Sequence, residues 1–131
     1  MKRQKITDNN GVGLLEVMVS MIIISIGLLG LAPLVVTSIE GNVISQDIST
    51  AGNLIKQSIE FYEGLDSISS VPLYISEDGL QNRFLRTTHI WDNTTDTLVP
   101  NDVYCIEVDV SWVDHKSVSH SRNYSTYILK D

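Results

Sequence analysis

The segment from Val17 to Ile39 contains 23 residues and no charged side chain, and it strongly limits the folds open to this chain. As a helix it would extend about 35 Å, because each residue adds roughly 1.5 Å. A bilayer core of about 30 Å needs around 20 apolar residues, so the segment is long enough to span a membrane. Burial inside a protein would require a large domain, and a chain of 131 residues leaves too few residues for one.

The charges on either side of this segment predict its orientation. Lys2, Arg3 and Lys5 precede it, whereas the first charged residues after it are Glu40 and Asp47. Basic residues stay on the cytoplasmic side of membrane helices, so the N-terminus is expected in the cytoplasm and the rest of the chain outside. A secretory signal has an apolar region of only about 7–15 residues before its cleavage site, and this segment is too long for one.

Composition excludes some classes of function. The formal net charge is −7. An acidic chain gains nothing from the counterion release that drives binding to phosphate backbones, so nucleic acid is not an expected partner. Cys105 is the only cysteine, which excludes an intramolecular disulfide and a zinc site built on several thiolates.

The apolar residues begin before Val17 and are interrupted once, at Glu16, where a carboxylate is costly. The string Gly11-Val12-Gly13-Leu14-Leu15-Glu16-Val17-Met18-Val19-Ser20 around it resembles the processing motif of type IV prepilins. In that family a short basic leader ends in glycine, and the fifth residue after the cut is glutamate. The resemblance implies a cut between Gly11 and Val12 by prepilin peptidase. It also implies N-methylation of Val12 and an assembly role for Glu16.

The match departs from the family pattern at two positions. Val12 stands where phenylalanine is usual, and Gly13 where threonine is usual. The continuation from Ile26 to Pro33 resembles the minor pilins of the PilV kind and, more loosely, the I-type minor pseudopilins of type II secretion.

The resemblance implies a structural role and no enzymatic activity. It predicts a minor pilin of a type IV pilus that primes or modifies filament assembly. The implied partners are other pilins and minor pilins, prepilin peptidase, an inner-membrane assembly platform and membrane lipid. The implied location is the bacterial inner membrane, with one pass and a periplasmic C-terminal domain, and the pilus or cell surface after assembly. Two alternatives stay open: a minor pseudopilin of a type II secretion system, and a signal-anchored periplasmic binding domain that does not polymerise.

Four small or imino residues follow in the span. Gly27, Gly30 and Ala32 permit close helix contacts, although such residues are also common in any membrane helix. Pro33 lacks an N–H and its ring clashes with the carbonyl of Leu29, so a kink or local opening is predicted there.

Beyond the span the pattern becomes amphipathic. The sequence predicts one helix from Val12 to Leu65, with Asp47 and Gln57 among the residues on its solvated side. Its later part carries an apolar stripe at three- and four-residue steps: Ile44, Ile48, Ala51, Ile55, Ile59 and Tyr62, widened by Leu54, Phe61 and Leu65. The domain division expected is residues 1–11 as leader, 12–40 as the membrane and assembly half of the helix, and 41–131 as a periplasmic pilin-like domain.

The remaining chain predicts a small antiparallel sheet. Residues 67–82 are expected to form a variable loop, and strands are expected at residues 83–91, 103–113 and 117–129. The strand 103–113 alternates between apolar and polar residues, with Tyr104 and Trp112 on its apolar side. The fold class is therefore α+β, with a long N-terminal helix packed on a small antiparallel sheet.

No pattern in the sequence predicts catalysis, a metal site or a cofactor. His115 and His120 could join Cys105 as metal ligands only in principle, because both histidines lie in polar segments. The loop 92–96 is rich in oxygen ligands but lacks the glycine and distal glutamate of an EF-hand. Trp112 is expected in the core, and Trp91 is the better candidate for a surface aromatic.

Overall fold

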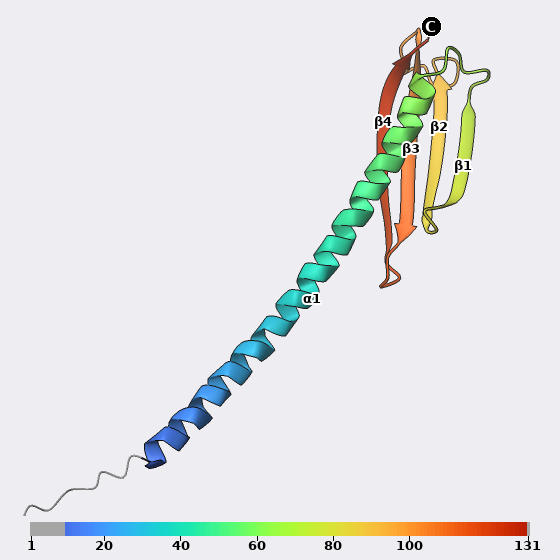
Figure 1. Ribbon diagram of the computed structural model, residues 1–131. Coiled ribbons are helices and arrows are strands. Elements are labelled where there is room, and N and C mark those ends of the chain that lie inside the picture. The colour runs from blue at the N-terminus through green and yellow to red at the C-terminus, as the bar shows by residue number, and fades with distance from the viewer. Residues whose placement is uncertain (1–9, 131) are drawn as a thin grey trace, which may run out of the picture. The chain divides into compact units, whose positions relative to one another are not determined.

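The computed structural model describes residues 10–130, with side chains described from Gly13 onward. The chain forms one helix and a meander of strands: α1 (Asn10–Glu63), β1 (Leu73–Leu80), β2 (Phe84–Asp92), β3 (Val103–Val113) and β4 (Ser119–Leu129). It divides into two compact units, residues 1–42 and residues 43–131. The second unit contains the later part of α1 and the whole sheet (Figure 1).

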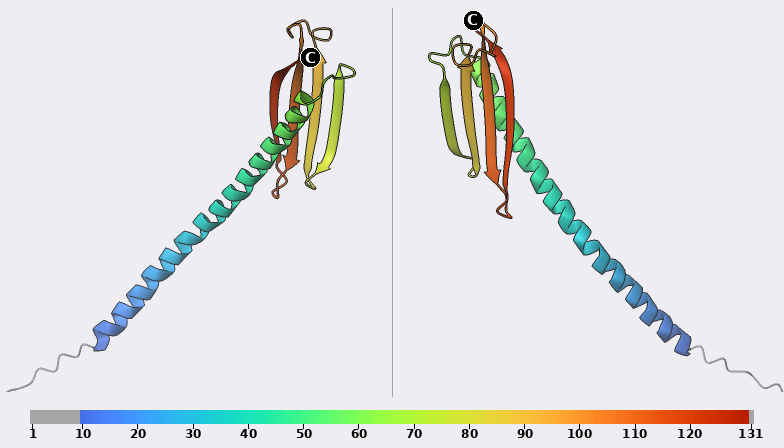
Figure 2. Two further views of the ribbon diagram at one scale, coloured as in Figure 1. Left: turned by 45° about the horizontal axis from the view of Figure 1, so that its top comes forward. Right: turned by 180° about the vertical axis from the view of Figure 1, so that it is seen from behind.

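The sheet has four antiparallel strands in the order β1-β2-β3-β4, so each strand pairs with its neighbours in sequence. The C-terminal part of α1 covers one face of it, in front of the sheet in Figure 1 and behind it in the reversed view of Figure 2. The predicted α+β class, a long N-terminal helix packed on a small antiparallel sheet, is confirmed.

The core lies between α1 and the two central strands. On β3 the residues with even numbers from Ile106 to Trp112 face α1 and are at most 5 % exposed, which confirms the alternation predicted for this strand. The helix contributes Ala51, Leu54, Ile55 and Tyr62 to the same cluster. Trp112 is a core residue as predicted.

The helix stripe differs from its prediction at both margins. Phe61 is 61 % exposed and Leu65 is 40 % exposed, so neither belongs to the buried stripe. Asp47, expected on the solvated side, is only 2 % exposed. Arg83, the last residue of the turn before β2, pairs with its carboxylate and so compensates the cost of burying it.

The expected loop over residues 67–82 is wrong in its second half, where β1 forms. Proline is tolerated at the start of an edge strand, so Pro72 precedes β1 and does not prevent it. Leu73 and Ile75 then pack against the core, while Tyr74 faces solvent. The predicted turn signal at Asp78-Gly79 does mark the strand's irregular end, where Gly79 has a φ of 74° and the pairing register shifts.

The helix ends at Glu63, two residues before the end predicted at Leu65. The Gly64 N–H bonds to the carbonyl of Glu60 at 3.1 Å and closes the last turn. A Cβ at Gly64 would lie 3.3 Å from that same oxygen, which is tighter than most Cβ contacts. A glycine therefore suits this position.

Candidate assembly segment and the surfaces of the globular unit

The first half of α1 exposes its apolar side chains in all directions. From Leu14 to Ile39 the exposed fractions of the large apolar residues run from 46 % at Val19 to 75 % at Leu29. The most apolar part of this helix has a mean hydropathy of 2.5, and none of it is buried. By length and composition the helix is able to cross a membrane. Nothing in the described chain covers this part of the helix.

Glu16 lies on this exposed helix and is the only charged residue between Gly13 and Ile39. Its backbone carbonyl accepts a hydrogen bond from Ser20 Oγ at 2.8 Å. The carboxylate has no ion-pair partner among the residues that the structure describes. A carboxylate that is unpaired in an apolar setting strongly favours any arrangement that supplies a cation.

The predicted cleavage site lies at the start of α1. Gly11 and Val12 have helical backbone, but their side chains lie outside the described residues. Residues 1–9, which include the basic leader residues, also lie outside that range. The cut and the methylation stay predictions.

Gly27 and Gly30 face open space, since a Cβ built on either would meet nothing within 4 Å. Any close helix contact at these positions must therefore come from another molecule. The helix continues without a break through Pro33. Thr37 Oγ1 bonds to the carbonyls of Pro33 at 3.1 Å and Leu34 at 3.0 Å. The kink at Pro33 stays a prediction.

In the globular unit, Arg86 joins α1 to the first two strands. Its guanidinium donates from Nη1 to the carbonyl of Leu54 at 2.9 Å and from Nε to Glu77 Oε2 at 2.7 Å. A second buried link joins the hydroxyls of Ser58 and Thr88 at 3.0 Å. These bonds fix how this part of α1 lies on β2, beyond what apolar packing alone would specify.

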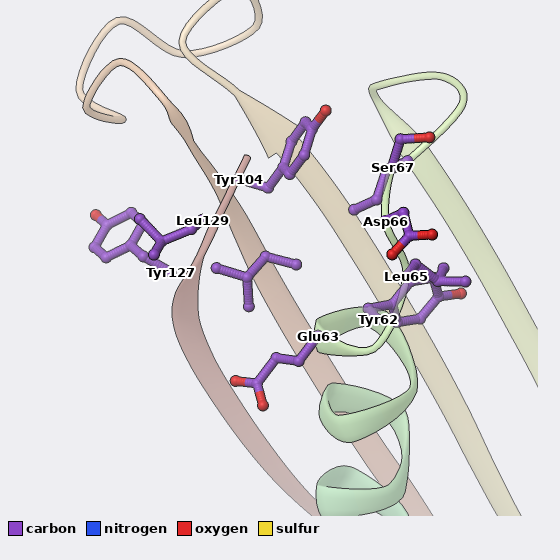
Figure 3. Close-up of a pocket in the computed structure, with 10 residues that line it drawn as sticks. Tyr62, Glu63, Leu65, Asp66, Ser67, Tyr104, Tyr127 and Leu129 are labelled. Atoms are coloured by element: carbon purple, nitrogen blue, oxygen red, sulfur yellow. The ribbon is translucent and has the colours of Figure 1, made fainter. Parts of the chain in front are cut away.

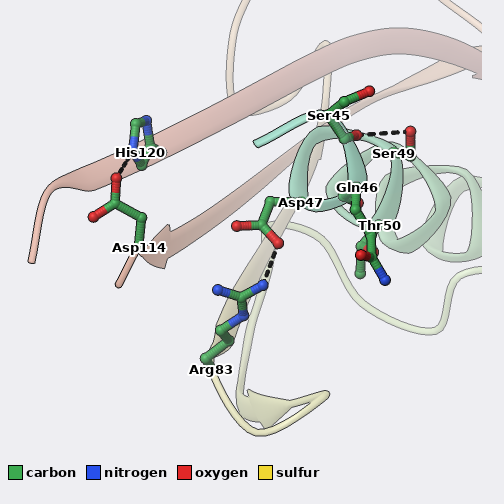
Figure 4. A network of polar contacts seen from close by, with 8 residues as sticks. All are labelled: Ser45, Gln46, Asp47, Ser49, Thr50, Arg83, Asp114 and His120. Carbon is green, nitrogen blue, oxygen red and sulfur yellow. Dashed lines mark hydrogen bonds and ion pairs between the residues drawn. The ribbon is translucent and has the colours of Figure 1, made fainter. Parts of the chain in front are cut away.

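Two further polar pairs hold the ends of strands. Lys130 Nζ donates to Asp92 Oδ2 at 2.8 Å, and this bond is the main reason that the pKa of Asp92 falls to about 2. His120 Nε2 lies 2.9 Å from Asp114 Oδ2 across the β3–β4 turn, and it lowers the pKa of Asp114 to about 2 (Figure 4).

Figure 4 also shows Asp47, whose Oδ1 binds Arg83. Its other oxygen, Oδ2, is buried without a hydrogen-bond partner. Asp47, Trp112 and His120 are among the residues that line a cavity of about 310 Å³.

No group of three or more histidine, cysteine, aspartate or glutamate side chains in the described chain is arranged to hold a metal. His120 is paired with Asp114, and His89 stacks on Trp91 with ring centroids 4.5 Å apart. Cys105 is buried, and burial raises the pKa of its thiol. In the loop after β2, Asp92 Oδ1 accepts hydrogen bonds from both N and Oγ1 of Thr94.

No pattern in the sequence predicted the cavity of about 360 Å³ at the end of the sheet where α1 stops (Figure 3). Glu63 and Asp66 contribute carboxylates to its lining, and three tyrosines contribute aromatic surface: Tyr62, Tyr104 and Tyr127. These residues come from α1, the following loop, β3 and β4, so only the fold brings them together.

Comparison with known proteins bears on the N-terminal segment. Residues 6–32 match the family described as the prokaryotic N-terminal methylation motif. No curated protein and no solved structure matches the chain. The motif, the exposed apolar helix and the helix-on-sheet unit are similar to those of type IV pilins and pseudopilins.

Such proteins are structural subunits that generally have no enzymatic activity. The motif implies processing by prepilin peptidase and assembly with pilins. Together with the apolar helix, it is consistent with anchoring in the inner membrane before assembly.

Proposed function

We propose that this chain is a minor pilin subunit of a type IV pilus that helps to prime or modify filament assembly. The observation that carries the proposal is an exposed apolar helix that begins within a methylation motif. A globular unit with its own hydrophobic core follows it. A helix that is apolar on every side has two suitable environments, the bilayer and a bundle of like helices. A pilin subunit moves from the bilayer into such a bundle, so its helix must be apolar on every side.

Cleavage after Gly11 would create a new cation, the α-amine of Val12, close to Glu16 in sequence. In a bundle of packed helices, the Glu16 carboxylate of one subunit would neutralise the Val12 amine of a neighbour. Both charges are costly alone in a medium of low dielectric constant, so pairing them favours subunits staggered along the filament axis.

Mass spectrometry of the N-terminus tests the processing step. The chain recovered from membranes should begin with N-methylated Val12, and Gly11→Val should leave the uncut precursor. A chain that keeps Met1, or a Gly11→Val variant that is shortened and methylated normally, would contradict the proposal.

A second measurement separates a pilus from a secretion pseudopilus. The minor pilin role predicts that the processed chain is present in sheared pili and that its deletion reduces piliation. Loss of protein secretion with normal piliation would favour the pseudopilin alternative.

A further inference from the structure

The two edges of the sheet are covered unequally, and β4 is the more open one. Through its register, Arg122, Tyr124 and Thr126 pair with Val110, Val108 and Ile106 of β3 and share their face. Those three β3 residues are fully buried, yet Tyr124 is 54 % exposed and Arg122 is also exposed. The face of β4 that is turned toward α1 is therefore uncovered at Arg122 and Tyr124, whereas Ile128 on the same face is buried in the core.

A groove of about 670 Å³ lies between α1 and β4. Ile48, Ile55 and Ile59 form its helix wall, and Gly52 widens it, since a Cβ there would meet nothing within 4 Å. Tyr124 and Arg122 form part of its strand wall. The helix wall is apolar at these isoleucines and charged at Lys56, Glu60 and Glu63. The strand wall carries a cation, Arg122, which has no ion-pair partner among the described residues.

The backbone edge beside this groove is suited to strand addition. All 11 residues of β4 pair with β3 in one unbroken register. β4 contains neither proline nor bulge, the features that commonly protect an edge, so its outward N–H and C=O groups are free to pair.

The opposite edge, β1, offers a matching strand (Figure 1). Residues Leu73 to Glu77 pair regularly with β2 before the register shifts. On the face turned toward α1 this edge presents Leu73, Ile75 and Glu77, all partly buried. Glu77 gives one carboxylate oxygen to Arg86, and its side chain is still 41 % exposed.

We propose that the β4 edge of one copy binds the β1 edge of a second copy and covers the β4 side of the groove. With Arg122 opposite Glu77 of the second copy, Tyr124 lies opposite Ile75 and Thr126 opposite Leu73. Tyr124 then gains an apolar neighbour beside it in the sheet, and the Arg122 guanidinium meets the exposed part of a carboxylate that Arg86 of the second copy also binds. On the solvent face the same register places Asn123 opposite Ser76.

Orientation supports this pairing over the pairing of two β4 edges. β1 and β4 run in opposite directions within one sheet, so antiparallel addition of β1 to β4 keeps both copies pointing the same way. Two antiparallel β4 edges would point the N-terminal helices in opposite directions. This inference rests on the proposed function for that orientation, since subunits anchored in one membrane must be parallel.

Cross-linking in membranes tests the contact with the full chain. Ser76→Cys and Asn123→Cys would be made separately in a Cys105→Ala background, tagged differently and co-expressed, because opposed strand positions lie close enough for a short bis-maleimide. We expect a cross-linked dimer carrying both tags from the mixture, and none from either variant alone. A dimer from Asn123→Cys alone at the same yield would overturn the proposal in favour of paired β4 edges. So would the absence of a mixed dimer when both chains are processed.

A charge variant tests the same interface by another route. Arg122→Glu should reduce the yield of mixed dimer roughly fivefold, because it replaces an opposite-charge pair with a like-charge one. Lys116→Glu makes the same change of charge on the β3–β4 turn and should leave the yield nearly unchanged. Equal loss in both variants would show a non-specific charge effect and overturn the assignment. If the chain enters filaments without this contact, the proposed function stands and this interface fails.

Discussion

Asp92 shows at the scale of a residue how a strand end is fixed. It ends β2, and its two oxygens accept bonds from Lys130 and from Thr94. These bonds stabilise the charged carboxylate, so its pKa drops from 3.8 to about 2 and the pKa of Lys130 rises. Lys130, the last residue that the structure describes, is thereby bonded to the end of the central strand β2.

The lowered pKa of Asp92 makes a prediction about acid stability. A carboxyl group whose pKa is lower when folded stabilises the fold at pH values above its unfolded pKa, and that contribution is lost as the pH falls toward about 2. Asp92→Asn should therefore be less stable than the parent at neutral pH and should lose less stability between pH 4 and pH 2. Urea unfolding followed by tryptophan fluorescence measures this. Asp66→Asn, an exposed site, should keep the parent's pH dependence.

Glu16 carries the second prediction at this scale. Glu16→Gln keeps the size of the side chain and removes its charge, so membrane insertion and cleavage after Gly11 should survive. The variant should accumulate in the inner membrane and be missing from sheared filaments, because no carboxylate is left to pair with a neighbour's amine. Immunoblots of membrane and filament fractions measure this. Normal entry of the variant into filaments would exclude charge neutralisation as the mechanism.

At the scale of elements, α1 is one continuous helix whose two halves differ in how their apolar residues are exposed. Up to Ile39 its apolar residues are exposed on every side, and from Ala51 onward a single stripe is buried against the sheet. The sequence predicted this change of periodicity and placed β3 at its observed bounds. It did not predict β1, because Pro72 and the Asp78-Gly79 pair were interpreted as turn signals, although residues Leu73 to Glu77 between them pair regularly with β2.

The buried stripe predicts unequal effects of substitutions on one helix. Ile55 is 7 % exposed, so Ile55→Ala should lower the free energy of unfolding by about 2–5 kcal/mol. Asn53 is exposed two residues earlier, and Asn53→Ala should change it by less than about 0.5 kcal/mol. Urea unfolding of both variants measures the difference. Equal effects would mean that a different face of the helix is buried.

At the scale of the whole molecule, charge and hydropathy are segregated. Residues 43–131 hold 13 acidic and 6 basic residues, so the whole formal charge of −7 belongs to the globular unit. The hydrophobic core belongs to that unit as well. The first unit contributes exposed apolar surface and no net charge.

This segregation predicts that residues 43–131 fold and stay soluble without the first unit. The fragment keeps the complete core cluster and loses the apolar span. Expressed alone, it should remain in the supernatant after ultracentrifugation and unfold cooperatively in urea. A fragment that sediments with membranes would show that the amphipathic part of α1 is itself an anchor.

The sequence by itself determined the features that depend on neighbouring residues along the chain. These are the apolar span, the motif around Glu16, the helix stripe and the alternation of β3, since hydropathy, motif spacing and side-chain period are local properties. Only the tertiary structure decided the burial of Asp47, the cavity beside Tyr104 and the open groove along β4. Asp47 is paired with Arg83, which lies 36 residues away in the sequence. β4 is an edge strand because no second strand of the chain pairs with its outer side. Neither property can be read from a stretch of sequence, because each depends on which distant segments the fold brings together.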